Sequence, residues 1–359
     1  MTRRTLTRWT PIALAVLVAL AGCGGDDDPA RPPAASRSYR MGFSPIPPRQ
    51  DPAIILPMLE MWTRRADAGL MLGEPPWDSM LAGIPTDGLV RRHILPIANY
   101  YRSKGLIVVA SMDPTNGLDR AADSEALVAA GRSLTETAIQ ALYRDYVVAL
   151  DTLVHPDYLS LASETNLVRG LAPPALYAAL KQNAADAFTA VRAHDATVRL
   201  FATVQVEVAW GPPPAAYVGI AQDLADFAFT EVLGLSSYPY FVWTDPDSLP
   251  VDYYSRITAG TGLPAMVIEG GWTSAQVGPV VSTPEKQARY IRRHAAILDA
   301  VGAAAAVFQI TFTDLDLTGV PLPTGSPLPL FASIGLVDVA LNPKPALGEW
   351  DAIFARPRR

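Results

Sequence analysis

Two glutamates, each placed directly after a short apolar segment, are the residues of this sequence best suited to chemistry. Glu164 follows the segment 158–162, and Glu269 follows the apolar run 265–268. Short apolar runs of this kind are typical of buried strands in a parallel sheet. We therefore expect each strand to present a carboxylate at its C-terminal end, where α/β barrels carry their catalytic groups.

Two carboxyl groups facing one pocket are the arrangement that hydrolysis of a glycosidic bond requires. One stays protonated and donates to the leaving oxygen, while the other attacks the anomeric carbon or activates a water. A separation of about 5–5.5 Å favours retention of configuration, and a wider one favours inversion. The sequence leaves an alternative open, in which one or both glutamates cap a helix or pair with an arginine at the rim.

The rest of the chain provides a scaffold that can bring these two glutamates together. Eight strand-like segments alternate with helical ones, and they fall at 39–43, 68–72, 106–110, 158–162, 199–208, 230–237, 264–269 and 304–311. A doubly wound sheet is the competing topology, but the chain has no Gly-rich phosphate loop. We predict a single (β/α)8 TIM barrel over residues 39–359, in which all C-terminal strand ends surround one pocket.

Composition narrows the classes of function. The 359 residues are 50% hydrophobic and 18% charged, which is typical of a globular chain with a large core. The net charge of -6 argues against nucleic-acid binding. None of the 4 histidines falls at a strand end, so we expect no metal and no cofactor. The absence of a Gly-x-Ser-x-Gly elbow argues against a serine hydrolase.

The N-terminus has the pattern of a secretory signal. Arg3 and Arg4 precede the apolar run 12–20, and small residues follow it up to Cys23. The end of this segment resembles a bacterial lipobox, which predicts a signal peptide over 1–22 and lipidation of Cys23. The alternative is a short signal-anchor with a buried cysteine. Cys23 is the only cysteine, so no intrachain disulfide can form.

Residues 23–38 are rich in Asp and Pro and predict a disordered tether between that cysteine and the barrel. We therefore expect a monomer outside the cytoplasm, either in the periplasm or at the cell surface. Its contact with the membrane would be through the lipid anchor alone.

The positions of the two glutamates in the order of strands resemble those in clan A glycoside hydrolases, which include cellulases, β-galactosidases and endo-β-1,4-galactanases. These retaining (β/α)8 enzymes carry an acid/base Glu after the fourth strand and a nucleophile Glu after the seventh. Residues 267–274, Val-Ile-Glu-Gly-Gly-Trp-Thr-Ser, resemble their nucleophile strand, and 236–239, Ser-Ser-Tyr-Pro, are similar to their sixth strand. The resemblance implies that Glu164 is the acid/base, Glu269 the nucleophile and Tyr238 the hydrogen-bond partner of Glu269.

The sequence also departs from this pattern. Ser163 stands where clan members carry an Asn that contacts the sugar 2-hydroxyl, and the first and second strands lack the usual arginine. No tryptophan follows the eighth strand. A second interpretation is therefore a barrel lipoprotein that binds a glycan without cleaving it, and a third is another barrel hydrolase or lyase.

Further residues at the predicted strand ends are candidates for binding an oligo- or polysaccharide. Indole rings are flat, stiff platforms for the C–H faces of sugars. The tryptophans expected at this face are Trp77, Trp210, Trp243 and Trp272. They could also simply plug the barrel mouth. The polar candidates are Asp113, Asn166, Gln205, Glu207 and Gln309, and Glu207 is also the reserve candidate for a catalytic carboxylate.

Overall fold

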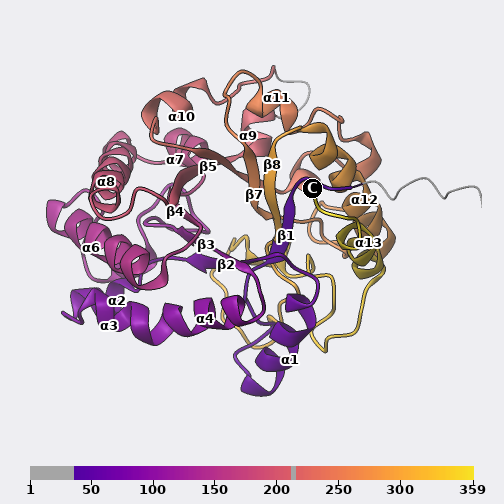
Figure 1. Ribbon diagram of the computed structural model, residues 1–359, viewed down its shortest axis with the longest axis horizontal. Helices are drawn as coiled ribbons and strands as arrows, with labels where there is room; N and C mark the ends of the chain where they lie inside the picture. The colour runs from indigo at the N-terminus through magenta and orange to yellow at the C-terminus, as the bar shows by residue number, and fades with distance from the viewer. Residues whose placement is uncertain (1–35, 212–215) are drawn as a thin grey trace, which may run out of the picture. The chain divides into compact units, whose positions relative to one another are not determined.

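Eight parallel strands close into a barrel in the computed structural model of the chain, which describes residues 36–211 and 216–359. Each strand pairs with its neighbours in sequence, and β8 closes the ring against β1, with Arg40 opposite Ala306 (Figure 1). The strands are β1 Arg40–Phe43, β2 Ala68–Gly73, β3 Ile107–Met112, β4 Tyr158–Ala162, β5 Arg199–Gln205, β6 Val232–Ser237, β7 Ala265–Gly270 and β8 Ala304–Gln309. The predicted (β/α)8 barrel is confirmed.

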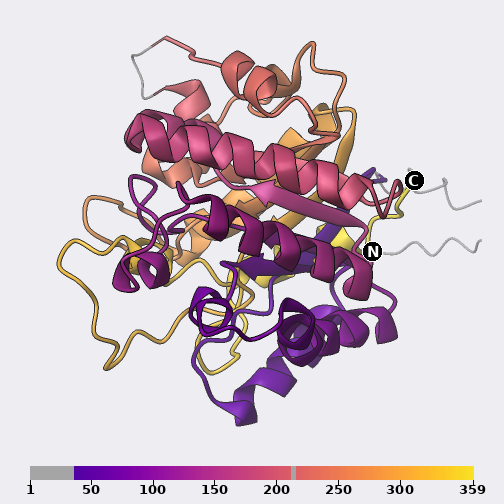
Figure 2. The same cartoon turned by 90° about the vertical axis from the view of Figure 1, so that its left-hand side faces the viewer.

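Helices surround the barrel on its outside. The α-helices are α1 Pro52–Thr63, α2 Trp77–Leu81, α3 Thr86–Leu89, α4 Leu95–Ser103, α5 Glu125–Ala129, α6 Thr137–Val154, α7 Thr165–Leu171, α8 Pro174–Arg192, α9 Val206–Trp210, α10 Ala221–Asp226, α11 Ser255–Thr258, α12 Pro284–Ala300 and α13 Pro345–Phe354. Shorter turns are η1 Val90–Ile94 (a π-helix) and the 3₁₀ turns η2 Pro239–Phe241, η3 Pro246–Ser248 and η4 Leu328–Phe331. Figure 2 shows α6 and α8 running side by side along the barrel.

Two segments differ from the sequence prediction. The strand predicted over 199–208 ends at Gln205, because the Gln205 side chain accepts a hydrogen bond from the Val208 N–H at 2.7 Å and thereby caps α9. The single helix predicted near 89–102 is divided into α3, η1 and α4. Pro96 lacks an N–H and interrupts the α-helical ladder, and the π-helical turn η1 lies immediately before it.

Alternate residues of the strands fill the barrel interior, while their neighbours pack against the helices. The interior cluster includes Leu70, Val109, Phe201, Met266 and Phe308, all of them buried. The larger cluster lies between strands and helices. Among the described residues, no helix is long and apolar enough to cross a membrane.

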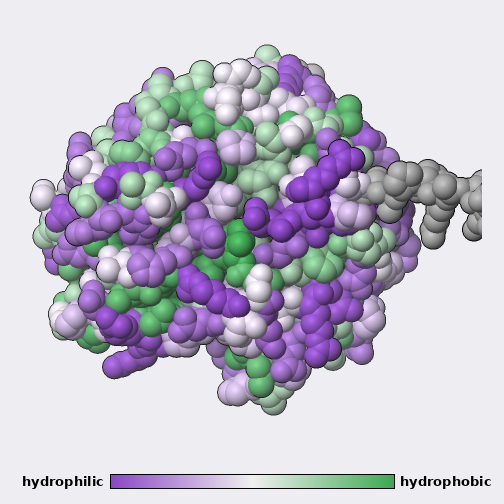
Figure 3. Space-filling model, viewed as in Figure 1, coloured by the Kyte–Doolittle hydropathy of each residue, from purple (hydrophilic) through white to green (hydrophobic). Residues whose placement is uncertain are grey.

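The two ends of the barrel differ. The long loop between β8 and α13 lies at one end and the C-terminus lies at the other (Figure 2). Figure 3 presents the same face as Figure 1, and hydrophilic and apolar residues are interspersed across it.

The chain joins the fold slightly earlier than the sequence suggested. The predicted signal peptide 1–22, Cys23 and the tether up to residue 35 lie outside the described residues. The compact unit spans Ser36–Arg359, so residues 36–38 belong to it although we expected them in the tether. Arg37 is buried, forms an ion pair with Asp67 at 2.6 Å and bridges to Arg358 of the C-terminal segment.

Gly42 gives a test of the packing inside the barrel. A Cβ built there would lie 2.3 Å from the Ala68 carbonyl oxygen and 2.6 Å from the Phe308 ring. Overpacking of this kind costs about 1–3 kcal/mol, so we expect Gly42→Ala to lower the free energy of unfolding by at least that amount. Gly348→Ala in α13 is the matched control, because nothing lies within 4 Å of its Cβ. It should raise stability by about 0.5–1 kcal/mol.

Urea denaturation of both variants checks this prediction. Equal and small effects of the two substitutions would contradict the close approach of β1 to β2 and β8.

Candidate active site

A cavity of about 740 Å³ opens at the C-terminal ends of the strands. The three predicted catalytic residues, Glu164, Glu269 and Tyr238, all line it. They come from the ends of β4, β7 and β6, respectively, so the barrel brings together side chains more than a hundred residues apart. The site is therefore where a (β/α)8 barrel is expected to carry its chemistry.

The backbone at Glu164 has an unusual conformation. With φ 45° and ψ 48° it is one of the few non-glycine residues of the described chain in the left-handed region, and its N–H donates to the Thr203 hydroxyl at 2.7 Å. Such conformations are unfavourable by about 1–3 kcal/mol and cluster at functional sites. Here the turn ends β4, starts α7 and leaves the carboxylate facing the cavity.

Two donors hold the Glu164 carboxylate. Arg120 donates from Nε to Oε2 at 2.7 Å, and the Ser236 hydroxyl donates to Oε1 at 2.5 Å. Arg120 also pairs with Asp113, so one guanidinium joins two carboxylates. All three ion-pair partners are buried, and both Glu164 oxygens accept hydrogen bonds. The alternative of pairing with an arginine thus holds for Glu164, within the cavity instead of at a solvent-exposed rim.

Glu269 has fewer polar partners. It lies opposite Ser236 in the β6–β7 ladder, at a shift of register, and Tyr238 donates from its hydroxyl to Oε2 at 3.4 Å. Burial raises the pKa of Glu269 to about 8, and the Glu164 charge adds to this, while Arg120 and the Tyr238 hydrogen bond oppose it. The unliganded site therefore favours a proton on Glu269 near neutral pH.

The two glutamates thus share one cavity in which the Glu269 carboxyl keeps its proton near neutral pH. The charge of a neighbouring carboxylate makes ionisation of Glu269 more difficult still. One protonated and one ionised carboxyl is the state that glycoside hydrolysis needs at the start of a turnover.

A third carboxylate, Glu207, lines the same cavity in the first turn of α9. It accepts hydrogen bonds from Tyr253 at 2.5 Å, from Ser237 at 3.1 Å and from Gln205. Burial raises the pKa of Glu207 to about 7, and the Tyr253 hydrogen bond opposes this.

These contacts continue away from the cavity. Tyr254 donates to the Ser237 hydroxyl at 3.1 Å, and its own hydroxyl lies 2.9 Å from Nε2 of His294. Burial lowers the pKa of His294 to about 3, so this imidazole is neutral. Glu207 is therefore held by a network of polar side chains that extends to α12.

The prediction that four tryptophans line the sugar-binding face is wrong. All four lie in the described part of the chain, and none lines the cavity. Trp77 and Trp272 are only 1% exposed. Trp77 stacks on Tyr143, and Trp272 donates from its indole N–H to Ser282 at 3.0 Å. Trp77, the first residue of α2, therefore packs against α6, and Trp272 packs against Tyr290 of α12.

The other two tryptophans support Tyr253 instead. Trp210 stacks on the Tyr253 ring at 5.4 Å, and Trp243 meets the same ring edge-on at 5.1 Å. Because Tyr253 donates to Glu207, these indoles act on the site through that tyrosine.

The polar candidates divide into two groups. Asp113, Gln205 and Glu207 line the cavity as predicted. Asn166 and Gln309 do not. Asn166 exchanges two hydrogen bonds of 2.8 Å with the backbone of Gln205, which ties α7 to β5, and Gln309 donates to the Ile334 carbonyl at 2.6 Å. Both side chains therefore hold neighbouring segments of the backbone together.

Sequence reasoning missed Arg120 and Ser236. Arg120 lies in the loop after β3, where no periodic pattern fixes the position of a side chain. A weak signal existed, since Asp113 at the end of β3 is a buried carboxylate in need of a cation. Ser236 precedes Tyr238 by two residues, and two-residue spacing along a strand places both side chains on one face.

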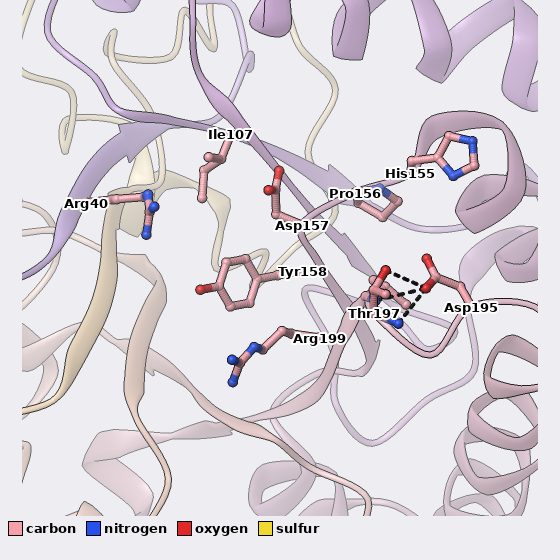
Figure 4. Close-up of a pocket in the computed structure, with 10 residues that line it drawn as sticks. Arg40, Ile107, His155, Pro156, Asp157, Tyr158, Asp195, Thr197 and Arg199 are labelled. Atoms are coloured by element: carbon pink, nitrogen blue, oxygen red, sulfur yellow. Dashed lines mark hydrogen bonds between the residues drawn. The ribbon is translucent and has the colours of Figure 1, made fainter.

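A second, smaller cavity of about 400 Å³ opens at the N-terminal strand ends. Figure 4 shows that Arg40, Tyr158 and Arg199 extend into it. Its carboxylates accept hydrogen bonds from the backbone: Asp157 accepts one from the Val108 N–H at 2.8 Å, and Asp195 accepts one from the Thr197 N–H. This cavity lacks a facing pair of carboxyl groups and is not a candidate for hydrolysis.

Comparisons with known proteins agree with the fold. No family model and no curated protein matches the sequence. Among solved structures, the chain is similar to exo-β-1,4-mannosidase Op5Man5 from Opitutaceae bacterium strain TAV5, with 16% identity and a TM-score of 0.62 over 89% of this chain and 60% of that one. It is also similar to xylanase 10B from Thermotoga maritima, with 15% identity and a TM-score of 0.56 over 88% of this chain and 95% of the xylanase.

A β-glucuronidase from an uncultured Clostridium sp. gives 13% identity and a TM-score of 0.55. The match includes 88% of this chain but only half of the glucuronidase. The neighbours therefore share the barrel, while residue roles must be argued from the site itself.

The raised pKa of Glu269 predicts a pH-dependent stability. The folded state holds this proton up to about pH 8, whereas the ordinary value for an unfolded chain is 4.5. The contribution to the free energy of unfolding is therefore full below pH 4.5 and is lost as the pH rises through 8. We expect Glu269→Gln, which cannot ionise, to raise the Tm relative to wild type by about 2–5 °C near pH 9 and by much less near pH 5.

Calorimetric scans at both pH values check this, with Glu60→Gln on the exposed face of α1 as the control. A Tm difference independent of pH would contradict the raised pKa.

Proposed function

We propose that this protein is a retaining glycoside hydrolase that cleaves a β-linked glycan with Glu164 and Glu269. The observation that carries the proposal is the pairing of these two carboxyl groups across one cavity at the C-terminal strand ends, with Tyr238 in contact with Glu269. The resemblance to clan A enzymes gives the division of roles, in which Glu164 is the acid/base and Glu269 the nucleophile.

In this mechanism Glu269 attacks the anomeric carbon while Glu164 protonates the glycosidic oxygen that leaves. Water, deprotonated by Glu164, then hydrolyses the glycosyl–enzyme ester and regenerates both groups. The Tyr238 hydroxyl donates to Glu269 and helps to orient the nucleophile.

The proton must change places when substrate binds. In the unliganded site it is favoured on Glu269, whereas attack requires the carboxylate there. Positive charge that develops at the anomeric carbon favours the ionised form of a neighbouring carboxyl. At the same time Arg120 must loosen its contact with Glu164, and Asp113 offers it an alternative partner.

A glycan-binding barrel without catalysis is the second candidate. Ser163 in place of the usual Asn and the engagement of both Glu164 oxygens favour it, because Arg120 or Ser236 must release an oxygen before Glu164 can contact a glycosidic oxygen.

Azide rescue tests the proposal and the assignment of roles together. The substrates are aryl β-glycosides, with β-glucan, galactan and mannan as polysaccharides. Glu269→Ala should abolish turnover, and added azide should restore it with a glycosyl azide of inverted configuration. Glu164→Ala should lower turnover by about 10²–10⁴. With a reactive aryl leaving group, azide should then give a product of retained configuration.

The control is Glu60→Ala, which should behave as wild type. Exchange of the two azide products between the variants would reverse the roles of Glu164 and Glu269. Tight binding of one glycan without turnover would replace the enzyme by the glycan-binding interpretation.

We further propose that the protein is held at a bacterial membrane by a lipid on Cys23. The proposal is supported by the basic, apolar and small-residue order of the first 23 residues. In a bacterial host fed an alkyne-bearing palmitate, wild type should take up the label and fractionate with membranes. Cys23→Ser should lose both, and no other cysteine can carry the label. Label retained by Cys23→Ser would contradict the anchor.

A further inference from the structure

Most of the polar side chains that line the catalytic cavity, here called its floor, have partners within the protein. Arg120 donates from Nε and Nη1 to Glu164 and Asp113. Both amide atoms of Gln205 and both carboxylate oxygens of Glu207 have partners. Few of these groups remain to bind hydroxyls, so the floor suits one sugar ring better than a chain of sugars.

The walls above this floor are apolar. They come from the loop after β3, from α7, from α9, from η2 and from η4, and include Leu118, Leu167, Val208, Phe241, Leu330 and Phe331. Leu118 and Phe241 are 46% and 40% exposed although they border the cavity. Large apolar side chains that remain exposed around a pocket mark a surface for an apolar ligand.

These walls differ from the surfaces that bind sugars. The branched aliphatic side chains of leucine and valine offer no flat platform, and the four indoles pack elsewhere. The two phenylalanines pack edge to face at 5.8 Å, and Phe331 meets the Tyr238 ring at 4.9 Å. The rings therefore form an apolar cluster directly over the tyrosine that contacts Glu269.

The apolar cluster is fixed in place by η4. The Tyr240 hydroxyl of η2 donates to the Leu330 carbonyl at 3.0 Å, which joins the segment after β6 to the long loop after β8. The wall is thus built into the site, and a cavity of about 740 Å³ leaves room for more than one sugar ring.

We propose that the substrate is a β-glycoside with an apolar aglycone, with its sugar on the floor and an alkyl, isoprenoid or aryl group against the walls. This proposal rests on the proposed glycosidase function. Cleavage breaks the bond from the anomeric carbon to the glycosidic oxygen and gives a free sugar and an apolar alcohol. Such a substrate can be a membrane glycolipid or a dissolved apolar glycoside, and the chemistry of recognition is the same.

Alkyl chain length is the direct test. Methyl, butyl and octyl β-glucosides, β-galactosides and β-mannosides are compared below their micellar concentrations. Burial of each additional CH₂ strengthens binding, so kcat/KM should rise at least about tenfold from butyl to octyl for the preferred sugar. Turnover that ignores the alkyl chain and favours oligosaccharides would overturn the inference while the glycosidase proposal stands.

A binding measurement separates the inference from catalysis. The fluorescent probe N-phenyl-1-naphthylamine should bind in the cavity and be displaced by octyl but not by methyl glycosides. Failure of octyl glycosides to displace the probe overturns the inference, whatever is cleaved. Displacement without turnover of any glycoside would overturn the proposed enzyme and leave an apolar ligand site.

A matched pair of variants locates the effect. Leu118→Ser should lower the octyl-to-methyl ratio of kcat/KM about threefold or more, since it replaces apolar wall by a hydroxyl. Leu171→Ser is the control, because Leu171 is 57% exposed at the end of α7 and does not line the cavity. Equal effects of both variants would contradict the wall.

Vesicles distinguish the two sources of substrate. Phosphatidylcholine vesicles that carry hexadecyl β-glycoside of the preferred sugar are offered beside dissolved octyl glycoside. Cleavage in the vesicles assigns a membrane glycolipid, and cleavage of the dissolved compound alone assigns a free glycoside.

Discussion

The charge balance around one guanidinium is the constraint on which the site depends. Arg120 lies among Asp113, Glu164 and Glu269, and burial makes any unpaired charge there expensive. One cation cannot neutralise three carboxylates, so at least one of them keeps a proton near neutral pH. The Glu269 carboxyl is therefore kept protonated near neutral pH by the protein itself, before any ligand arrives.

The barrel supplies the distances that this balance needs. Four features position the two glutamates. They are the left-handed turn at Glu164, the register shift between β6 and β7, and the hydroxyls of Thr203 and Ser236. Each of these groups belongs to a different strand or turn, so the closed ring of strands is what makes the cluster rigid. Arg120 is the exception, because it is delivered by a loop and held chiefly by its ion pairs.

The sequence predicted those features that obey a period or a strong local signal. The eight strands and the pairing of Glu164 with Glu269 in one cavity follow from apolar runs and from the geometry of parallel barrels. The contact from Tyr238 was predicted only from the resemblance of residues 236–239 to the sixth strand of clan A enzymes. The prediction for the tryptophans was wrong because a position after a strand end does not determine the direction in which the following segment folds. Arg120 could not be located for the same reason, since a loop residue finds its partner only after the barrel has closed.

The support of Glu207 illustrates how polar and apolar packing act together. Gln205 caps α9 and donates to Glu207, and the Trp210–Tyr253 stack holds the phenol that donates to the same carboxylate. The buried carboxylate therefore has its position set by one helix start and one aromatic stack.

The 3₁₀ turn η4 has a wider consequence. It belongs to the long segment between β8 and α13, which closes over the site but forms no part of the ring of strands. Part of the apolar wall, Leu330 and Phe331, is thus encoded by a stretch of the gene separate from the one that encodes the two glutamates. Mutation or replacement of that one segment can reshape this part of the cavity in a related chain while the carboxyl pair is inherited unchanged.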